Sequence, residues 1–179
     1  MRSDAEKILL TEEEIKAKVF EMGQTISTEY EGKDLLMVGI LKGAMIFMAD
    51  LVRSVTIPVE FDFMAVSSYG GSSKSSGVVR ILKDLEQNIE GRHVLLVEDI
   101  VDTGLTLKYL LDNLQTRDPA SVKACTLLDK PERRKVEVAV DYNGFTIPDE
   151  FVVGYGLDYN EKYRNLKDIL VLSPDIYQK

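Results

Sequence analysis

The fold of this chain is decided by one stretch, Val94-Leu95-Leu96-Val97-Glu98-Asp99-Ile100-Val101-Asp102-Thr103-Gly104-Leu105-Thr106-Leu107. Four apolar residues lead directly into two adjacent carboxylates, a pattern typical of a strand that is buried in a parallel sheet. An amphipathic helix is expected next, because leucines follow at the spacing i, i+3, i+4, i+7, namely Leu107, Leu110, Leu111 and Leu114. The acids and the Thr-Gly turn are therefore expected between a strand's carboxyl end and a helix's amino end, where open α/β sheets bind ligands.

The residue types in this stretch suit a phosphorylated sugar. Thr103, Gly104 and Thr106 offer hydroxyls and backbone N–H groups at a helix start, where the positive end of the helix dipole favours a phosphate. The two adjacent acids carry only acceptors, which suit a sugar diol or a hard cation with its waters. Asp102 stands apart and is placed to handle a proton. The alternative is a solvated acidic turn with a helix cap, but three acids beside a phosphate-type turn favour a ligand site.

Length and composition indicate a single globular domain over residues 1–179. Hydrophobic residues make up 45% and charged residues 29% of the chain, which are ordinary values. The net charge of -8 argues against a general affinity for nucleic acid or for an anionic membrane. Cys125 is the only cysteine and lies in an apolar run, so we expect it to be buried and inert. We see no signal peptide and no membrane span, and we expect a cytoplasmic protein.

The rest of the chain alternates between strand and helix patterns. Thr11 and Glu14 form a capping box that opens a helix, and residues 35–40 and 44–52 are expected to be a buried strand and a buried helix. Further strands are expected at residues 59–66, 78–82, 122–128, 136–140, 151–158 and 169–172. The pattern predicts an α/β fold with a mainly parallel sheet flanked by helices, and a small hood subdomain from the terminal segments.

Residues 67–77 hold six serines and three glycines and too few apolar groups to pack. Structureless loops inside compact domains are usually lids or binding loops. A passive surface loop is the alternative. We expect a mobile lid, because Tyr69 and Lys74 give the segment side chains to contribute.

Four separated motifs resemble the type I phosphoribosyltransferase family, and its hypoxanthine-guanine branch in particular. The stretch 98–106 resembles the family's motif for phosphoribosyl pyrophosphate (PRPP). Leu41-Lys42-Gly43 resembles its pyrophosphate loop, in which the Leu-Lys peptide is typically cis. Residues 128–130 resemble its purine-reading lysine segment, and residues 151–164 resemble its C-terminal signature. The resemblance covers about residues 11–172.

The resemblance implies a role for each residue of the PRPP motif. Asp102 would face purine N7 as the general acid/base. Glu98 and Asp99 would contact the ribose hydroxyls and, together with Asp158, would organise Mg²⁺. The 5′-phosphate would lie in a cradle formed by Asp102, Thr103, Gly104, Leu105 and Thr106.

The other motifs are matched to the remaining parts of the substrates. Pyrophosphate would be held by Lys42, Gly43 and Arg164. Ser68 and Tyr69 match the contact pair of the family's lid. An ordinary strand connection with a surface lysine remains the alternative for Lys42.

The purine would bond through its O6 to Lys130 and stack on Phe151. Backbone groups of Val152 and Asp158 would read the edge of its ring. The implied function is purine salvage, in which PRPP and hypoxanthine or guanine give IMP or GMP and pyrophosphate. The resemblance also implies a homodimer or a homotetramer.

Three other interpretations stay open at this point. The enzyme could prefer another base, such as xanthine. The chain could be a non-catalytic regulator that binds RNA or DNA and senses PRPP, although such relatives tend to lack an acid at the position of Asp102. It could also be a nucleotide-binding module without turnover.

Overall fold

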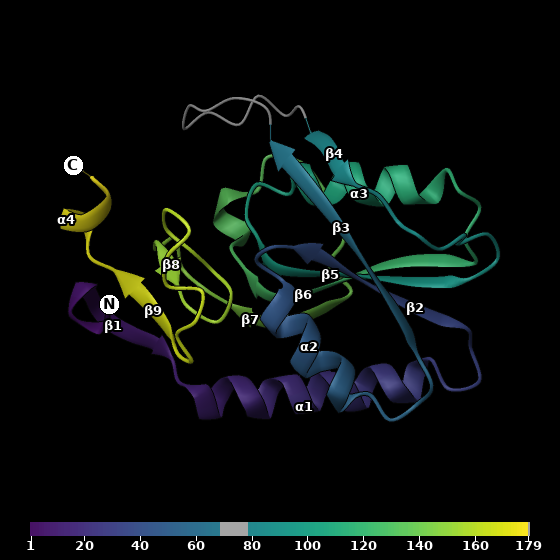
Figure 1. Ribbon diagram of the computed structural model, residues 1–179, viewed down its shortest axis with the longest axis horizontal. Coiled ribbons are helices and arrows are strands. Elements are labelled where there is room, and N and C mark those ends of the chain that lie inside the picture. Colours follow the sequence, from purple (N-terminus) through teal and green to yellow (C-terminus); the bar gives the residue numbers. More distant parts are fainter. Residues whose placement is uncertain (69–78, 179) are drawn as a thin grey trace.

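The computed structural model describes residues 1–68 and 79–178 and contains two sheets (Figure 1). The larger sheet has six strands in the order β4-β3-β2-β5-β6-β7, of which only β4 is antiparallel to its neighbour. The strands are β2 (Leu35–Leu41), β3 (Glu60–Ser68), β4 (Val79–Lys83), β5 (His93–Val101), β6 (Ser121–Asp129) and β7 (Tyr142–Thr146). The expectation of a mainly parallel α/β sheet is confirmed.

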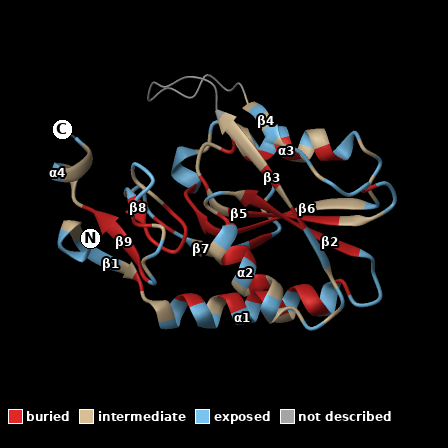
Figure 2. Cartoon of the chain, viewed as in Figure 1, coloured by how far each residue is buried: buried red, intermediate tan, exposed pale blue. Residues whose placement is uncertain are grey.

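Helices cover both faces of this sheet. Helices α1 (Glu12–Glu29) and α2 (Met45–Ser54) pack on one face, and α3 (Leu105–Gln115) packs on the other (Figure 1). Alternate residues of the central strands therefore enter different cores: Met37 joins the α1/α2 side, while Leu36 joins the α3 side. Figure 2 shows the central strands as the most buried part of the molecule. Burial on both faces explains their unbroken apolar sequence.

The second sheet is the hood, a name used here for residues 1–10 and 150–178. It has three antiparallel strands in the order β1-β9-β8. Strand β1 (Ala5–Leu10) pairs with β9 (Ile169–Leu172), which pairs with β8 (Val152–Val153). Both ends of the chain thus meet beside the large sheet, with the short helices η1 (Arg2–Asp4) and α4 (Pro174–Tyr177) at the rim (Figure 1). The expected hood from the terminal segments is confirmed, although β1 itself was not predicted.

The capping box at the start of α1 is present as predicted. The Thr11 hydroxyl accepts a hydrogen bond from the backbone N–H of Glu14 at 3.2 Å, and the Glu14 carboxylate accepts one from the N–H of Thr11 at 2.8 Å. The two bonds satisfy donors that a helix start otherwise leaves unpaired.

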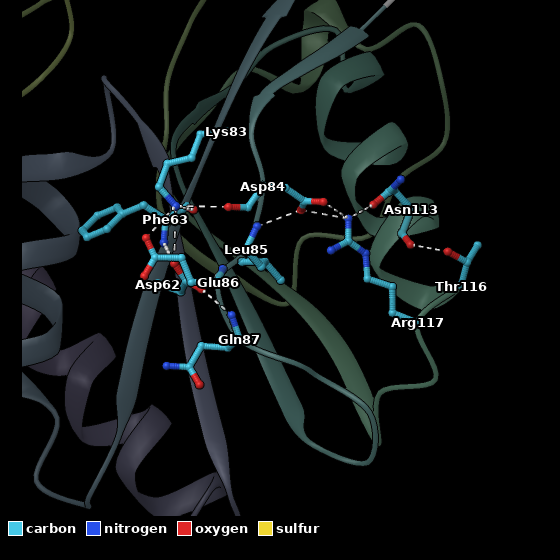
Figure 3. A network of polar contacts seen from close by, with 10 residues as sticks. All are labelled: Asp62, Phe63, Lys83, Asp84, Leu85, Glu86, Gln87, Asn113, Thr116 and Arg117. Atoms are coloured by element: carbon cyan, nitrogen blue, oxygen red, sulfur yellow. Dashed lines mark hydrogen bonds and ion pairs between the residues drawn. The ribbon is translucent and has the colours of Figure 1, made fainter.

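A polar network fixes the connection that follows β4 (Figure 3). The Asp62 carboxylate accepts hydrogen bonds from the backbone N–H groups of Glu86 and Gln87, at 2.8 and 3.2 Å. Burial by itself would raise the pKa of Asp62, but these bonds and one from Phe63 outweigh burial and hold the pKa below its usual value. Arg117, beyond the end of α3, bonds Asp84 in the same connection at 3.0 Å.

The prediction of a strand at residues 136–140 was wrong. This segment is irregular, and its valines cover the loop after β5: a Cβ on Gly104 would lie 2.9 Å from Val138 Cγ1. The N–H of Lys135 donates to the Thr103 carbonyl at 2.9 Å, which ties the segment to that loop. The strand beside β6 is instead β7, which was not predicted. Its sequence contains an Asn-Gly pair, a pattern more typical of a turn. Gly144 sits there because a Cβ would lie 2.5 Å from the Leu127 carbonyl oxygen.

Two other boundaries also differ from the expectation. The strand expected at 151–158 is only Val152–Val153, because the next three residues have positive φ, with values of 103° at Gly154, 51° at Tyr155 and 100° at Gly156. Strand β5 continues to Val101, so Glu98 and Asp99 lie within it and not in the loop beyond it.

Part of the expected lid lies outside the described residues. Residues 69–77, including Tyr69, are not described, and Ser68 is described only as the last backbone position of β3. The lid therefore stays a prediction. In the described part of the chain, no helix combines the length and the apolar character needed to cross a membrane.

Candidate active site

The predicted site residues gather at the carboxyl edge of the large sheet. The loop after β2 carries Lys42 and Gly43, the loop after β5 carries Asp102 to Gly104, and Lys130 follows β6 directly. Strands β2, β5 and β6 are neighbours, so these loops lie side by side. The hood loop at residues 154–164 closes against them. This is the position at which parallel sheets bind ligands.

The loop between β5 and α3 forms a small hollow. Gly104 is the N-cap of α3 and adopts φ of +82°, a conformation in which a side chain would also collide with Arg134 and Val138. The carbonyl of Asp102 accepts a hydrogen bond from Arg134 Nη1 at 3.0 Å, which holds the loop in place. The hollow is lined by Glu98, Ile100, Val101, Asp102, Thr103, Gly104, Thr106 and Leu107. A helix start with an uncapped first turn is suited to a phosphate.

Glu98 lines this hollow and Asp99 follows it in β5, and neither carboxylate forms an ion pair with a cation from residues 1–68 or 79–178. Burial raises the pKa of Glu98 well above its usual value, and the charge of Asp99 raises it further. Burial also raises the pKa of Asp99, although a 2.8 Å bond from the Ile100 N–H works against it. A Cβ on Gly43 would lie 1.9 Å from Asp99 Oδ2, so a side chain at this position would displace the Asp99 carboxylate.

The donor chemistry of this pair fits a hard divalent cation. Carboxylate oxygens are the ligands that Mg²⁺ prefers, and its charge would offset the repulsion between the buried Glu98 and the partly exposed Asp99. Within residues 1–68 and 79–178, no group of three or more acidic, histidine or cysteine side chains is close enough to hold an ion alone. This agrees with the usual habit of Mg²⁺, which takes one or two carboxylates and completes its shell with water and substrate phosphates.

The predicted pyrophosphate residues lie together at the junction of sheet and hood. The Leu41–Lys42 peptide is cis, as the resemblance implied. The Lys42 ammonium lies 2.8 Å from the Glu161 carboxylate, and Arg164 Nη2 lies 3.3 Å from the other oxygen of the same carboxylate. Arg164 Nη1 also donates to the Gly156 carbonyl at 2.7 Å. A Cβ on Gly156 would lie 2.2 Å from the Gly43 carbonyl oxygen, so the two loops touch through backbone alone.

A larger pocket lies beside the hollow and shares Ile100 and Asp102 with it. Lys130 reaches into it with only 7% of its surface exposed, and burial lowers the pKa of its ammonium. The N–H of Lys130 donates to the Val101 carbonyl at 2.9 Å, which fixes the lysine next to the β5 loop. The complete lining is Ile100, Asp102, Lys130, Arg133, Asp149, Phe151, Val152, Leu157 and Tyr177.

Asp102 stands on the border between the hollow and the pocket. Its Oδ1 atom lies 2.6 Å from Arg133 Nε, and the proximity of this carboxylate raises the pKa of the guanidinium. This oxygen is therefore already paired with a cation, and the Asp102 side chain as a whole is 41% exposed. A ligand at the border would share the carboxylate with Arg133 or displace the arginine from it.

Phe151 borders the pocket and is 37% exposed. It stacks on Tyr177 with ring centroids 4.7 Å apart and planes inclined by 20°, and Tyr159 meets it edge-on at 5.8 Å. Val152 is buried in β8 beside it. The Asp158 carboxylate accepts a bond from the Glu161 N–H at 2.9 Å and pairs with Arg164 at 3.2 Å, so it lies at the pyrophosphate end of the site.

Comparison with known proteins agrees with this geometry. The model of the phosphoribosyl transferase domain family matches residues 6–160. The chain is 54% identical to hypoxanthine-guanine phosphoribosyltransferase of Mycobacterium avium, over 98% of this chain and 90% of that protein. The chain belongs to the hypoxanthine-guanine branch of the phosphoribosyltransferase family.

Two further relatives of this branch describe how closely the fold is shared. A crystal structure of a hypoxanthine phosphoribosyltransferase from Staphylococcus aureus superposes with a TM-score of 0.97 at 49% identity, and the match covers 100% of this chain and 97% of that one. The bifunctional protein TilS/HprT of Listeria monocytogenes is 54% identical over the whole chain, which spans 28% of that longer protein.

Sequence reasoning missed several residues that line this phosphoribosyltransferase site. Arg133 and Asp149 border the pocket of Lys130, Tyr177 covers Phe151, and Glu161 joins the two predicted pyrophosphate cations. Arg133, Asp149 and Glu161 each lie within three residues of a predicted site residue, which is a weak signal. Tyr177 comes from a separate segment, and no local pattern marks a residue that tertiary packing brings to a site.

Proposed function

We propose that this protein is a hypoxanthine/guanine phosphoribosyltransferase of purine salvage. It transfers the 5-phosphoribosyl group from PRPP to hypoxanthine or guanine, and it releases IMP or GMP and pyrophosphate. The observation that carries this proposal is the position of Asp102, which lines both the phosphate-type hollow and the pocket that holds Lys130. One carboxylate between a sugar-phosphate site and a base site is what a glycosyl transfer between them requires.

The reaction breaks the C1′–O bond of PRPP and forms a bond from C1′ to N9 of the purine. Asp102 accepts the proton that the purine gives up at N7, because its side chain lines both the hollow and the pocket. The residues Thr103, Gly104, Leu105 and Thr106 hold the 5′-phosphate at the start of α3. Glu98 and Asp99 hold the ribose hydroxyls.

Pyrophosphate leaves with the negative charge of the broken bond. Lys42, the backbone of Gly43 and Arg164 hold it at the junction of sheet and hood. Mg²⁺ would bind among Glu98, Asp99 and Asp158, which form no complete three-carboxylate site within residues 1–68 and 79–178, so water and substrate phosphates would complete its shell. It would neutralise further charge on the departing group. The carboxylates near these two cations outnumber them, so a polyanionic ligand needs such an ion. Ser68 and Tyr69 complete the lid in this proposal.

The base is chosen by Lys130 and held by Phe151. An ammonium has only donors, so Lys130 pairs with the O6 acceptor of hypoxanthine and guanine and is mismatched to the 6-amino group of adenine. Phe151 supplies an aromatic face. The ring edge is read by the backbone of Val152, which lines the pocket, and by that of Asp158, which follows the lining residue Leu157.

The proposed enzyme acts as one domain over residues 1–179, in the cytoplasm, as a homodimer or homotetramer. Self-association is supported by an apolar groove on α2 and β3, where Met45 and Phe61 are more than half exposed. Light scattering after gel filtration tests it. Wild type should form an oligomer and a Phe61→Glu variant should be a monomer. An oligomer of unchanged mass in Phe61→Glu would remove the groove from this role.

A single assay tests the activity. Purified protein is mixed with PRPP, Mg²⁺ and one of four bases, which are hypoxanthine, guanine, xanthine and adenine, and pyrophosphate release is followed. Hypoxanthine and guanine should react well and adenine poorly. Preference for xanthine would identify another base as substrate, and absence of turnover with every base would identify a regulator or a nucleotide-binding module.

A further inference from the structure

Glu161 holds both cations of the pyrophosphate site at once. One of its oxygens lies 2.8 Å from the Lys42 ammonium, and the other lies 3.3 Å from Arg164 Nη2. Lys42 lies in the loop after β2, 119 residues before Glu161, and Arg164 lies in the hood, 3 residues after it. The carboxylate therefore bridges the loop of the large sheet and the hood. A bridge of two anionic oxygens between two cations is also what a bound pyrophosphate would make.

The backbone holds this carboxylate in place. Glu161 has φ of +61° and Asn160 has φ of +49°, which non-glycine residues adopt only when the surroundings impose it. The N–H of Glu161 donates to the Asp158 carboxylate at 2.9 Å, which fixes the turn. The pairing with Lys42 lowers the pKa of Glu161, so the group is a carboxylate at neutral pH.

The pairing is also easy to break. The side chains of Lys42 and Glu161 are 69% and 64% exposed, and ion pairs between exposed groups contribute little. Arg164 is not fully satisfied in this arrangement, because its Nε is buried and has no hydrogen-bond acceptor in the described residues. An arginine with an unpaired buried donor gains from a rearrangement that supplies an acceptor.

We propose that Glu161 is an internal substitute for pyrophosphate that sets the affinity of the site for PRPP and for pyrophosphate. The inference rests on the proposed function, which places pyrophosphate between Lys42 and Arg164. An incoming anion has to displace the carboxylate from both cations, so it binds less tightly than it would to free cations. The same carboxylate returns to the cations when pyrophosphate departs, which favours product release.

The test is a Glu161→Gln variant, which keeps the shape of the side chain and removes its charge. The matched control is Glu12→Gln, which makes the same change in net charge. Glu12 also bridges two cations, because its carboxylate lies 2.7 Å from Lys16 and 3.7 Å from Lys167. Titration calorimetry with pyrophosphate and Mg²⁺ at low ionic strength measures the affinity of both variants and of wild type. Thermal unfolding checks that all three proteins are folded.

Glu161→Gln should bind pyrophosphate and PRPP roughly 3- to 10-fold more tightly than wild type, the range expected from losing two competing exposed pairs. The gain should shrink as salt screens the charges. Glu12→Gln should stay within about twofold of wild type. An unchanged or weaker affinity of Glu161→Gln for pyrophosphate would overturn the proposal. It would show that the carboxylate either does not affect binding or helps to position the two cations.

A Lys42→Ala variant separates this inference from the function on which it rests. If Lys42→Ala weakens pyrophosphate binding and Glu161→Gln does not strengthen it, the site is correct and only the role of Glu161 is wrong. If Lys42→Ala binds pyrophosphate as wild type does, the proposed placement of pyrophosphate is itself wrong, and the role of Glu161 is lost with it.

Discussion

The large sheet and the hood contribute to the site in different ways. The sheet is built from consecutive strand-helix units, and its loops present Asp102, the phosphate-type turn and Lys130 from rigid strand ends. The hood is built from segments at opposite ends of the chain, with Ala5 paired to Leu172. It contributes Phe151 and Arg164, which in the proposed function contact the base and the pyrophosphate. We infer that the sheet carries the chemistry and the hood adjusts affinity and fit.

Removal of the metal should have the largest effect, and it should act across both regions. Glu98 and Asp99 belong to the sheet and Asp158 to the hood, and their charge has to be balanced before a polyanion can bind. Turnover with hypoxanthine and PRPP should be lost in excess chelator and restored by added Mg²⁺. Full turnover in chelator would show that the carboxylates need no ion.

Asp102→Asn should have the largest effect among single substitutions. The sheet positions this acid for proton transfer, which typically contributes about 10²- to 10⁴-fold to a rate. We expect kcat to fall by that range, with little change in the PRPP dissociation constant. Rapid-quench and calorimetric measurements on both proteins check this, and an unchanged kcat would remove Asp102 from the proposed role.

Lys130→Ala should raise the KM for hypoxanthine and guanine and leave PRPP affinity nearly intact. An unpaired buried oxygen on the base costs about 1–3 kcal/mol, which corresponds to roughly 5- to 150-fold in KM. Steady-state kinetics with both bases provides the measurement. A variant that keeps the KM of wild type would make Lys130 a structural lysine.

Tyr177→Ala should have the smallest effect, because it acts through Phe151. Loss of a stacked aromatic pair costs about 0.5–1.5 kcal/mol, so the KM for hypoxanthine should rise only a few-fold. Tyr177→Phe keeps the stacking ring and should restore the KM of wild type. Equal KM values in all three proteins would show that the ring of Tyr177 does not support the base site.

The two regions also differ in how far the sequence predicts them. The sheet's central strands are short apolar runs between turns, and β2 and β6 were predicted within a residue or two. The start of β5 was predicted equally well, but the strand continues about four residues beyond its apolar run, through Glu98 and Asp99 to Val101. Strand β1 was missed because its sequence, Ala-Glu-Lys-Ile-Leu-Leu, is mixed and its partner β9 lies about 160 residues away. Strand β7 was missed because Asn143-Gly144 suggests a turn, whereas the glycine is needed for close approach to β6.

The same contrast holds for the site. Lys42, Asp102 and Lys130 follow the ends of β2, β5 and β6, so local sequence places them at one edge. The neighbours of these residues cannot be placed in that way. Glu161 reaches Lys42 only because the hood loop folds over the sheet, and Tyr177 reaches Phe151 only because the C-terminal turn packs beside β8. Local patterns locate an edge of the sheet, and tertiary packing decides what covers it.

The most direct test of this division is a paired measurement on Thr106→Ala in the sheet's phosphate loop and Phe151→Ala in the hood. PRPP affinity is measured by calorimetry and the KM for hypoxanthine by steady-state kinetics, with Thr106→Ser as the control that keeps the hydroxyl. Thr106→Ala should weaken PRPP roughly 10-fold or more, because it removes a hydrogen bond to a charged group, and it should leave the KM for hypoxanthine nearly unchanged. Phe151→Ala should raise the KM for hypoxanthine and leave the affinity for PRPP nearly unchanged. If each variant weakens the binding of PRPP and of hypoxanthine equally, the sheet and the hood do not have separate roles in binding. That result would contradict the central claim.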